Sequence, residues 1–115
     1  MQRHKHVDEL GLFNEKNAKG DTPLHLAVKQ DFPEGIEVLA QYDTNLEAKN
    51  SLTGDTALLM AVKSSSLETV KTLLDCGASC NTPNPQTGMT PLIFLELHDT
   101  GDSDSERMIN IFFNR

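Results

Sequence analysis

The chain has 115 residues, of which 37% are hydrophobic and none is Trp, so we expect one small domain without a large aromatic core. Seventeen acidic residues against ten Lys and Arg give a formal charge of −7. This balance argues against direct binding to nucleic acid, because affinity for phosphate backbones comes mainly from Lys and Arg.

Residues 1–16 form the first predicted segment, either a partial helical cap or a loose end, because no clear apolar period runs through it. Its start, MQRHKHVDEL, lacks the apolar stretch of a secretory signal, and no later apolar run approaches the roughly 20 residues that span a bilayer. Cys76 and Cys80 are too few for a disulfide framework. We therefore expect no membrane contact and a cytoplasmic, alternatively nuclear, location.

An internal repeat dominates the rest of the chain. The hexapeptide Gly20–His25 (GDTPLH) recurs as Gly54–Leu59 (GDTALL) and again, after a step of the same length, as Gly88–Ile93 (GMTPLI). The correspondence continues downstream, where Ala27–Lys29 matches Ala61–Lys63 at that same step. A fixed period with matching downstream positions predicts a stack of similar structural units.

Each copy predicts two short helices. Thr22 and Thr90 can each cap a first helix that opens with Pro, whose missing N–H costs nothing at that position. Apolar residues then recur at i, i+3 and i+4, the spacing of one helix face. In the first two copies these residues are Leu24, Ala27 and Val28, then Ile36, Leu39 and Ala40, then Leu58, Ala61 and Val62, and finally Val70, Leu73 and Leu74. Gly77 is placed to end a helix in the left-handed conformation, and residues 45–54 and 79–88 predict protruding turns.

The third copy carries an acidic insert within residues 98–106. Its second helix matches that of the second copy only with a longer step than the one between the hexapeptides, which sets Val70 against Ile109 and places Phe112 and Phe113 on the apolar face. We expect the insert to lengthen the loop between the two helices, with Ser103 and Glu106 forming a capping box on the second. The Phe pair on the last helix indicates a further neighbour, a chain cut from a longer one, or a dimer through this end.

Gly-x-Thr-Pro-Leu-His at this period, followed by Leu-Leu-x-x-Gly-Ala, resembles the ankyrin repeat over residues 17–115. The resemblance implies an all-α solenoid of helix pairs with β-turn fingers. It implies about three repeats, at about 17–50, 51–84 and 85–115, of which the last is incomplete. Stacking supplies the core, because a single repeat cannot bury its apolar faces alone. Leu59 and Ile93 depart from the motif's His, which in the family helps tie the turn of one repeat to the next.

The resemblance also implies a partner-binding surface on the concave face, formed by finger tips and by the exposed end of each first helix. Leu52 and Met89 are the apolar residues of this surface that could anchor a partner. For any single position, an ordinary surface residue without contact to a partner is an equally open interpretation. The corresponding residues are Lys19, Asp21, Lys29 and Gln30 in the first repeat, Ser51, Leu52, Thr53, Asp55, Lys63 and Ser64 in the second, and Pro85, Gln86, Thr87, Met89, Leu97 and His98 in the third.

Residues 46–58 (LEAKNSLTGDTAL) and 61–68 (AVKSSSLE) are similar to repeats of the inhibitor-of-NF-κB group. This similarity implies capture of a Rel-type transcription factor, whose basic surface an acidic solenoid would suit. The short chain also resembles virus-encoded members of that group. Asn81 corresponds to the position that asparaginyl hydroxylase modifies in ankyrin repeats, and Ser103 in the acidic insert is a candidate for phosphorylation.

The sequence gives little support for a metal site, a calcium-binding loop or a catalytic site. Cys76 and Cys80 lack a second pair, and the four His residues lack a carboxylate or Cys at ligand spacing, so we expect no metal. The acidic residues of the insert do not fit an EF-hand, and a solvated loop that attracts a basic partner is the simpler interpretation. No phosphate-binding loop or Ser/His/Asp set stands out, so we expect no enzyme, no cofactor and no small-molecule substrate.

The sequence therefore predicts a protein–protein interaction module that binds and sequesters a partner by steric masking, with a Rel/NF-κB-type transcription factor as the specific candidate. The alternative is an adaptor or scaffold fragment of a larger multi-repeat ankyrin protein without autonomous activity.

Overall fold

The computed structural model describes residues 14–42, 44–98 and 103–113, and the side chains of all of these except 103–105. This part of the chain holds six helices: α1 (Pro23–Lys29), α2 (Pro33–Ala40), α3 (Ala57–Lys63), α4 (Leu67–Asp75), α5 (Pro91–Leu97) and α6 (Ser103–Phe113). None of them is long and apolar enough to cross a membrane. Residues 1–13 of the predicted N-terminal segment lie outside the described part, so both interpretations of that segment stay open.

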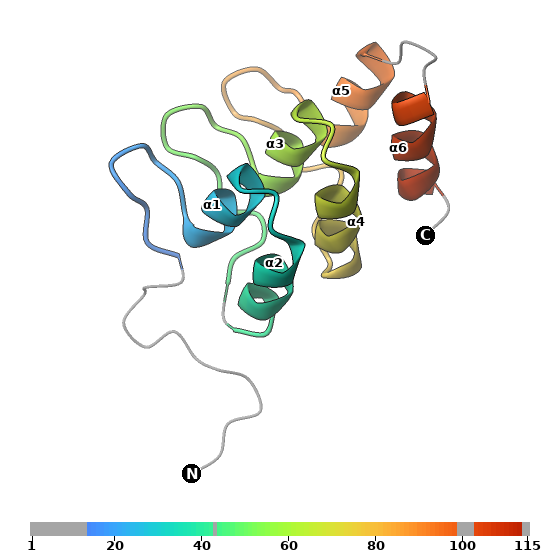
Figure 1. The fold of residues 1–115 in the computed structure, drawn as a ribbon. Coiled ribbons are helices and arrows are strands. Elements are labelled where there is room, and N and C mark those ends of the chain that lie inside the picture. Colours follow the sequence, from blue (N-terminus) through green and yellow to red (C-terminus); the bar gives the residue numbers. More distant parts are fainter. Residues whose placement is uncertain (1–13, 43, 99–102, 114–115) are drawn as a thin grey trace.

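The helices stack in two layers (Figure 1). The inner helices α1, α3 and α5 pack one on the next, the outer helices α2, α4 and α6 do the same, and each inner helix packs on the outer helix that follows it. A loop precedes each inner helix, and the three loops project on the same side of the stack (Figure 1). We call them the first finger (14–21), second finger (44–55) and third finger (79–89), and a finger with its helix pair a repeat. The predicted all-α stack of helix pairs is confirmed.

The starts of the inner helices follow from their threonines. The side chains of Thr22, Thr56 and Thr90 accept hydrogen bonds from the backbone N–H groups three residues later, at 3.3, 3.2 and 3.0 Å. Each bond satisfies a donor that the first helical turn leaves without an intrahelical partner. The caps predicted for the first and third repeats are confirmed, and the second repeat uses the same device without proline.

Residues with a positive φ mark where the helices end and where the chain turns into the next helix. Gly77 has φ +104° directly after the C-cap of α4, as predicted. Asp31 and Ser65 occupy equivalent turns between inner and outer helices with φ 51° and 56°, a strained conformation for residues that carry a Cβ. Asp31 is also tied across the stack, because its carboxylate accepts a hydrogen bond from the hydroxyl of Thr69 on α4. The strain at Asp31 therefore comes with a contact between two repeats.

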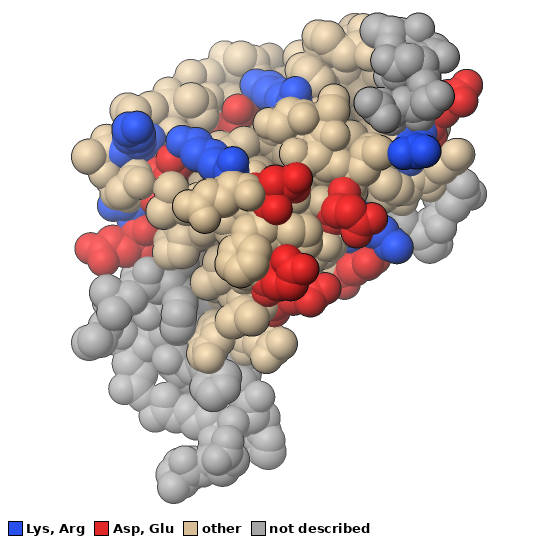
Figure 2. Space-filling model, in the orientation of Figure 1, with Lys and Arg blue, Asp and Glu red and all other residues tan. Residues whose placement is uncertain are grey.

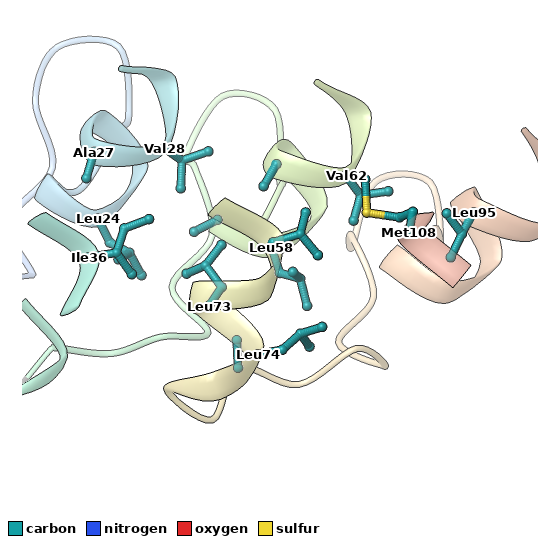
Figure 3. Close-up of a cluster of buried hydrophobic side chains, with 14 residues drawn as sticks. Leu24, Ala27, Val28, Ile36, Leu58, Val62, Leu73, Leu74, Leu95 and Met108 are labelled. Atoms are coloured by element: carbon teal, nitrogen blue, oxygen red, sulfur yellow. The ribbon is translucent and has the colours of Figure 1, made fainter. Parts of the chain in front are cut away.

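The core runs the length of the stack between the two helix layers (Figure 3). Ten of the predicted core positions are buried, and Leu39 and Ala40 of α2 are half-buried. Complete burial of a Leu, Ile or Val side chain contributes about 1.5–3 kcal/mol, so this shared core accounts for much of what holds the repeats together. The ten buried residues are Leu24, Ala27, Val28, Ile36, Leu58, Ala61, Val62, Val70, Leu73 and Leu74.

The predicted alignment of α6 is wrong by one position. Met108 is the buried residue of this helix at 3% exposed, whereas Phe113 is 63% exposed. Met108, Ile111 and Phe112 have the spacing of Val70, Leu73 and Leu74, so Val70 corresponds to Met108 rather than to Ile109. Both alignments keep the i, i+3, i+4 spacing, and packing against the core selects the one with Met108 inside.

The acidic insert is also partly helical rather than only a loop. Helix α6 begins at Ser103 and has 11 residues, against 9 in α4. Residues 98–102 separate α5 from α6, where 30–32 and 64–66 separate the earlier pairs. The predicted capping box concerns the side chain of Ser103, which lies outside the described residues.

Candidate interaction surface

His25 fastens the first inner helix to the second finger. Its ring is fully buried, and Nε2 donates to the backbone carbonyl of Asp55 at 2.9 Å, while Nδ1 accepts from the backbone N–H of Thr22 at 3.2 Å. Burial lowers the pKa of His25 below its ordinary value, and the hydrogen bond to the Asp55 carbonyl only partly opposes this effect. The predicted histidine tie is therefore confirmed at the junction of the first and second repeats, with a neutral ring.

Two asparagines bridge the fingers in the same way. The amide group of Asn50 donates to the Asp21 carboxylate at 2.6 Å and to the Lys19 carbonyl at 3.1 Å. Asn84 repeats this arrangement one finger later, with 2.8 Å to the Asp55 carboxylate and 2.8 Å to a backbone carbonyl. Both asparagines are buried. This pair was not predicted from the sequence, although the two asparagines are separated by the period of the hexapeptide, a signal that indicates them.

Asp21 and Asp55 are buried, so the expectation that they lie on the exposed binding surface is wrong. Lys29 reaches Asp21 at 2.5 Å, and Lys63 reaches Asp55 at 3.2 Å. Burial raises the pKa of Asp21, but the hydrogen bonds from Lys29 and Asn50 outweigh this effect and leave the pKa below its ordinary value. Each aspartate therefore links its own inner helix to the next finger, and the lysine covers it from solvent.

Glycines make the close approach of the fingers possible. Gly54 has φ +82°, and a Cβ built there would lie 2.5 Å from Oδ1 of Asn84. Gly20 has φ +81°, and its Cβ would lie 2.8 Å from the backbone nitrogen of Ser51. Gly88 has a similar φ of +76° with no atom within 4 Å. The glycine that opens each motif is needed for its conformation in all three fingers, and for space in the first two.

Most of the remaining predicted surface positions are exposed along the fingers and the ends of the inner helices. Leu52 at the tip of the second finger is 65% exposed, whereas Met89 is half-buried. Contact of these residues with a partner stays a prediction. The exposed ones are Lys19, Lys29 and Gln30 in the first repeat, Ser51, Leu52, Thr53, Lys63 and Ser64 in the second, and Pro85, Gln86, Thr87, Leu97 and His98 in the third.

Charge is unevenly divided over this surface. In Figure 2, acidic side chains gather over the outer helices α2 and α4, where Glu34, Glu37 and Glu68 are exposed. Lys29 and Lys63 are exposed on the inner helices of the first two repeats. Helix α5 of the third repeat has Glu96 and neither Lys nor Arg. The exposed acidic residues of the described part therefore gather mainly on the outer helices, whereas the inner helices of the first two repeats expose lysines.

Among the described residues, no three His, Cys, Asp or Glu side chains come together in a way that could hold a metal ion. Cys76 and Cys80 are free and half-buried, and burial, followed by the charges of Glu37 and Asp75, raises the pKa of the Cys76 thiol. A raised pKa keeps this thiol protonated and poorly nucleophilic at neutral pH. Asn81 is exposed, and the side chain of Ser103 lies outside the described residues, so both modification sites remain predictions.

A shallow apolar groove of about 450 Å³ lies between α1 and α2, and it was not predicted from the sequence. Leu26, Phe32 and Val38 line it together with Gly35. A Cβ on Gly35 would lie 2.5 Å from the Phe32 ring, so the ring can pack against this part of α2 only because residue 35 has no side chain.

Comparison with known families gives the same result as the geometry. The family described as ankyrin repeats (3 copies) matches residues 3–84, which is more than half of the chain. The match begins within the N-terminal segment and ends before α5, although α5 and α6 continue the stack in the same manner. None of the curated proteins compared with the chain matches it. The repeated threonine caps, the histidine tie and the family match together show that the chain belongs to the ankyrin-repeat family, whose members are protein–protein interaction modules.

Proposed function

We propose that this chain binds a protein partner through its fingers and inner-helix ends and sequesters it, and that the partner is a Rel-type transcription factor met in the cytoplasm or nucleus. The observation that carries the proposal is a row of exposed side chains held on fingers that buried hydrogen bonds fix to one another. The buried side chains of Asn50 and Asn84 anchor consecutive fingers through hydrogen bonds of 2.6–3.1 Å. A surface fixed in this way loses little conformational entropy on binding, which favours tight association.

The resemblance of residues 46–68 to repeats of the inhibitor-of-NF-κB group supports the choice of partner. The formal charge of −7 favours the encounter with a basic target through the field of the whole molecule, since the acidic side chains gather over α2 and α4 and the fingers and inner-helix ends expose Lys19, Lys29 and Lys63. The mechanism would be steric. While the chain covers the basic nuclear-localisation segment or the DNA-binding face of the factor, that surface is closed to the import machinery or to DNA.

The experiment is a titration of the purified chain with a purified Rel-homology region at physiological ionic strength, followed by competition with DNA. We expect saturable binding that weakens as salt is added and that excludes DNA from the complex. Leu52→Glu, at the tip of the second finger, should weaken binding about tenfold or more if Leu52 is an anchor. Val38→Glu, which changes an exposed aliphatic residue on α2, is the matched control and should leave binding unchanged.

Absence of binding to any Rel-homology region would refute the specific proposal. If affinity capture from a lysate then recovers another protein that competes at the same fingers, the sequestering function stands with a different partner. If the isolated chain captures nothing, the alternative of an adaptor or scaffold fragment of a larger protein is favoured.

A further inference from the structure

The apolar groove between α1 and α2 exposes positions that the second repeat buries. Val38 of α2 lines the groove and is 52% exposed, whereas Thr72, one period later on α4, is 8% exposed. Leu39 also lines the groove and is half-buried, whereas its counterpart Leu73 is fully buried. The second repeat has the first packed against it, through α1 on α3 and α2 on α4, and the corresponding face of the first repeat carries the groove.

The residues at this end of the stack (Figure 1) are also more apolar than an open surface requires. Phe32 lines the groove and is 50% exposed, and one period later the second repeat has Ser66. Leu26 lines it as well and is 37% exposed, whereas its counterpart Met60 packs against the core. Covering large apolar side chains such as Leu26, Phe32 and Val38 stabilises a protein in proportion to the apolar area removed from water. The groove therefore has the character of a surface that another segment covers.

The first finger is held in the same way as the finger that follows α2. The side chain of Asn14 accepts a hydrogen bond from the backbone N–H of Asn45 at 2.7 Å, at the base of the second finger. One repeat later, the carboxylate of Glu47 accepts one from the backbone N–H of Ser79 at 2.9 Å, at the base of the third finger. The second finger is preceded by α2 and the third by α4. The residues that lead into the first finger therefore stand where the periodic stack has an outer helix beside α2.

Residues 1–13 lead into that finger, and their length and composition suit the groove. The segment is longer than α2, which has 8 residues, and a fully extended stretch of this length reaches about 40 Å. Its apolar side chains are Val7, Leu10, Leu12 and Phe13. The ankyrin-repeat match begins at residue 3 and so includes most of the segment.

We propose that residues 1–13 pack against the groove between α1 and α2 and cover it with their apolar side chains. The segment is tethered beside the groove at Asn14, so its effective concentration there is in the millimolar range, well above that of a free partner. This contact goes beyond the binding of a partner at the fingers. It gives the first repeat a cover from its own chain, and any protein that docks in the groove has to displace this cover.

The direct test is nuclear magnetic resonance of the full natural chain with labelled Leu and Val methyl groups. We expect nuclear Overhauser effects, which report protons close in space, between the methyl groups of Leu26 or Val38 and those of Val7, Leu10 or Leu12. This measurement needs no variant, so it decides the proposal even if a substitution prevents folding.

Amide hydrogen exchange supplies the second test. The double variant Leu10→Ser with Leu12→Ser should exchange its α1 and α2 amides about tenfold faster or more, with a smaller change in α5, because the cover lies on the first repeat. Phe113→Ser is the matched control, since it removes an apolar side chain that is 63% exposed on α6, at the other end of the stack. This control should leave exchange in α1 and α2 unchanged.

Three results would overturn the proposal. The first is the absence of Overhauser effects between the segment and both Leu26 and Val38. The second is unchanged exchange in α1 and α2 of the folded double variant. The third is sedimentation that shows a dimer dissolved by Val38→Ser, because a second copy would then occupy the groove. None of these results bears on the titration with a Rel-homology region, which tests the fingers.

Discussion

Replacing Asn84 with Ala removes the buried bridge between the second and third fingers. The side chain loses a hydrogen bond of 2.8 Å to the Asp55 carboxylate, another of 2.8 Å to the Thr53 carbonyl, and, within the third finger, one of 2.7 Å that Oδ1 accepts from the backbone N–H of Gln86. A buried hydrogen bond to a charged group contributes about 1.5–3 kcal/mol and a neutral one about 0.5–1.5 kcal/mol, and Lys63 still pairs with Asp55 after the substitution. We therefore expect the free energy of unfolding to fall by about 3 kcal/mol.

Urea unfolding followed by far-UV circular dichroism measures this loss, with linear extrapolation to zero denaturant. Gln86→Ala is the matched control, since Gln86 bridges the same two fingers through an exposed hydrogen bond of 3.0 Å to the Leu52 carbonyl. Removal of an exposed bond should cost about 0.5 kcal/mol or less. Amide exchange in α5 should quicken more than in α1, because the third repeat is the one uncoupled. A loss below about 1 kcal/mol for Asn84→Ala, or one equal to that for Gln86→Ala, would refute the reasoning.

Three further predictions concern backbone conformation and protonation. Gly54→Ala and Gly88→Ala should each lower the free energy of unfolding by about 1–2 kcal/mol, because both positions have a positive φ. Gly54→Ala should lose more, since its new Cβ would lie 2.5 Å from Oδ1 of Asn84, whereas a Cβ at Gly88 meets no atom within 4 Å. Equal losses in urea unfolding would contradict the finger packing. Ser65→Gly should raise the free energy of unfolding by up to about 1 kcal/mol, because glycine adopts φ 56° without strain. Asp31→Gly should give no gain, because the variant also loses the hydrogen bond between Asp31 and Thr69 of α4. Equal gains for both variants in urea unfolding would show that this hydrogen bond does not contribute to stability. The pKa of His25 is lowered in the folded state, so the unfolded state takes up the proton first, and stability should fall as pH drops below about 6.5. Urea midpoints at pH 7.5 and 5.5 should therefore differ more for the natural chain than for His25→Leu, and an equal difference would contradict the neutral buried ring.

The sequence predicted the repeat architecture and most of the core. Thr22 caps α1 and Leu24 faces the core, as predicted, because a helix cap and an i, i+3, i+4 apolar face both depend on residues close together in the chain. The register of α6 escaped prediction, since Met108 and Ile109 begin equally good apolar patterns. Only the packing of α6 against α4 and α5 distinguishes them, and it buries Met108.

The interaction surface was harder to predict for a related reason. An aspartate after a turn glycine is expected to face solvent, yet Asp21 is buried by Lys29 of its own repeat and by Asn50 of the next finger. Asn50 belongs to the following repeat, far along the chain from Asp21, so neither the local pattern nor the composition indicates the contact.

Period, helix caps and apolar faces were thus determined by the sequence alone, because each depends on residues a few positions apart or on their recurrence. The burial of Asp21 and Asp55 was decided only by stacking, because it depends on what the neighbouring repeat places beside each position. The motif position that is a buried polar link in the first two repeats is therefore occupied in the third by the half-buried, apolar Met89.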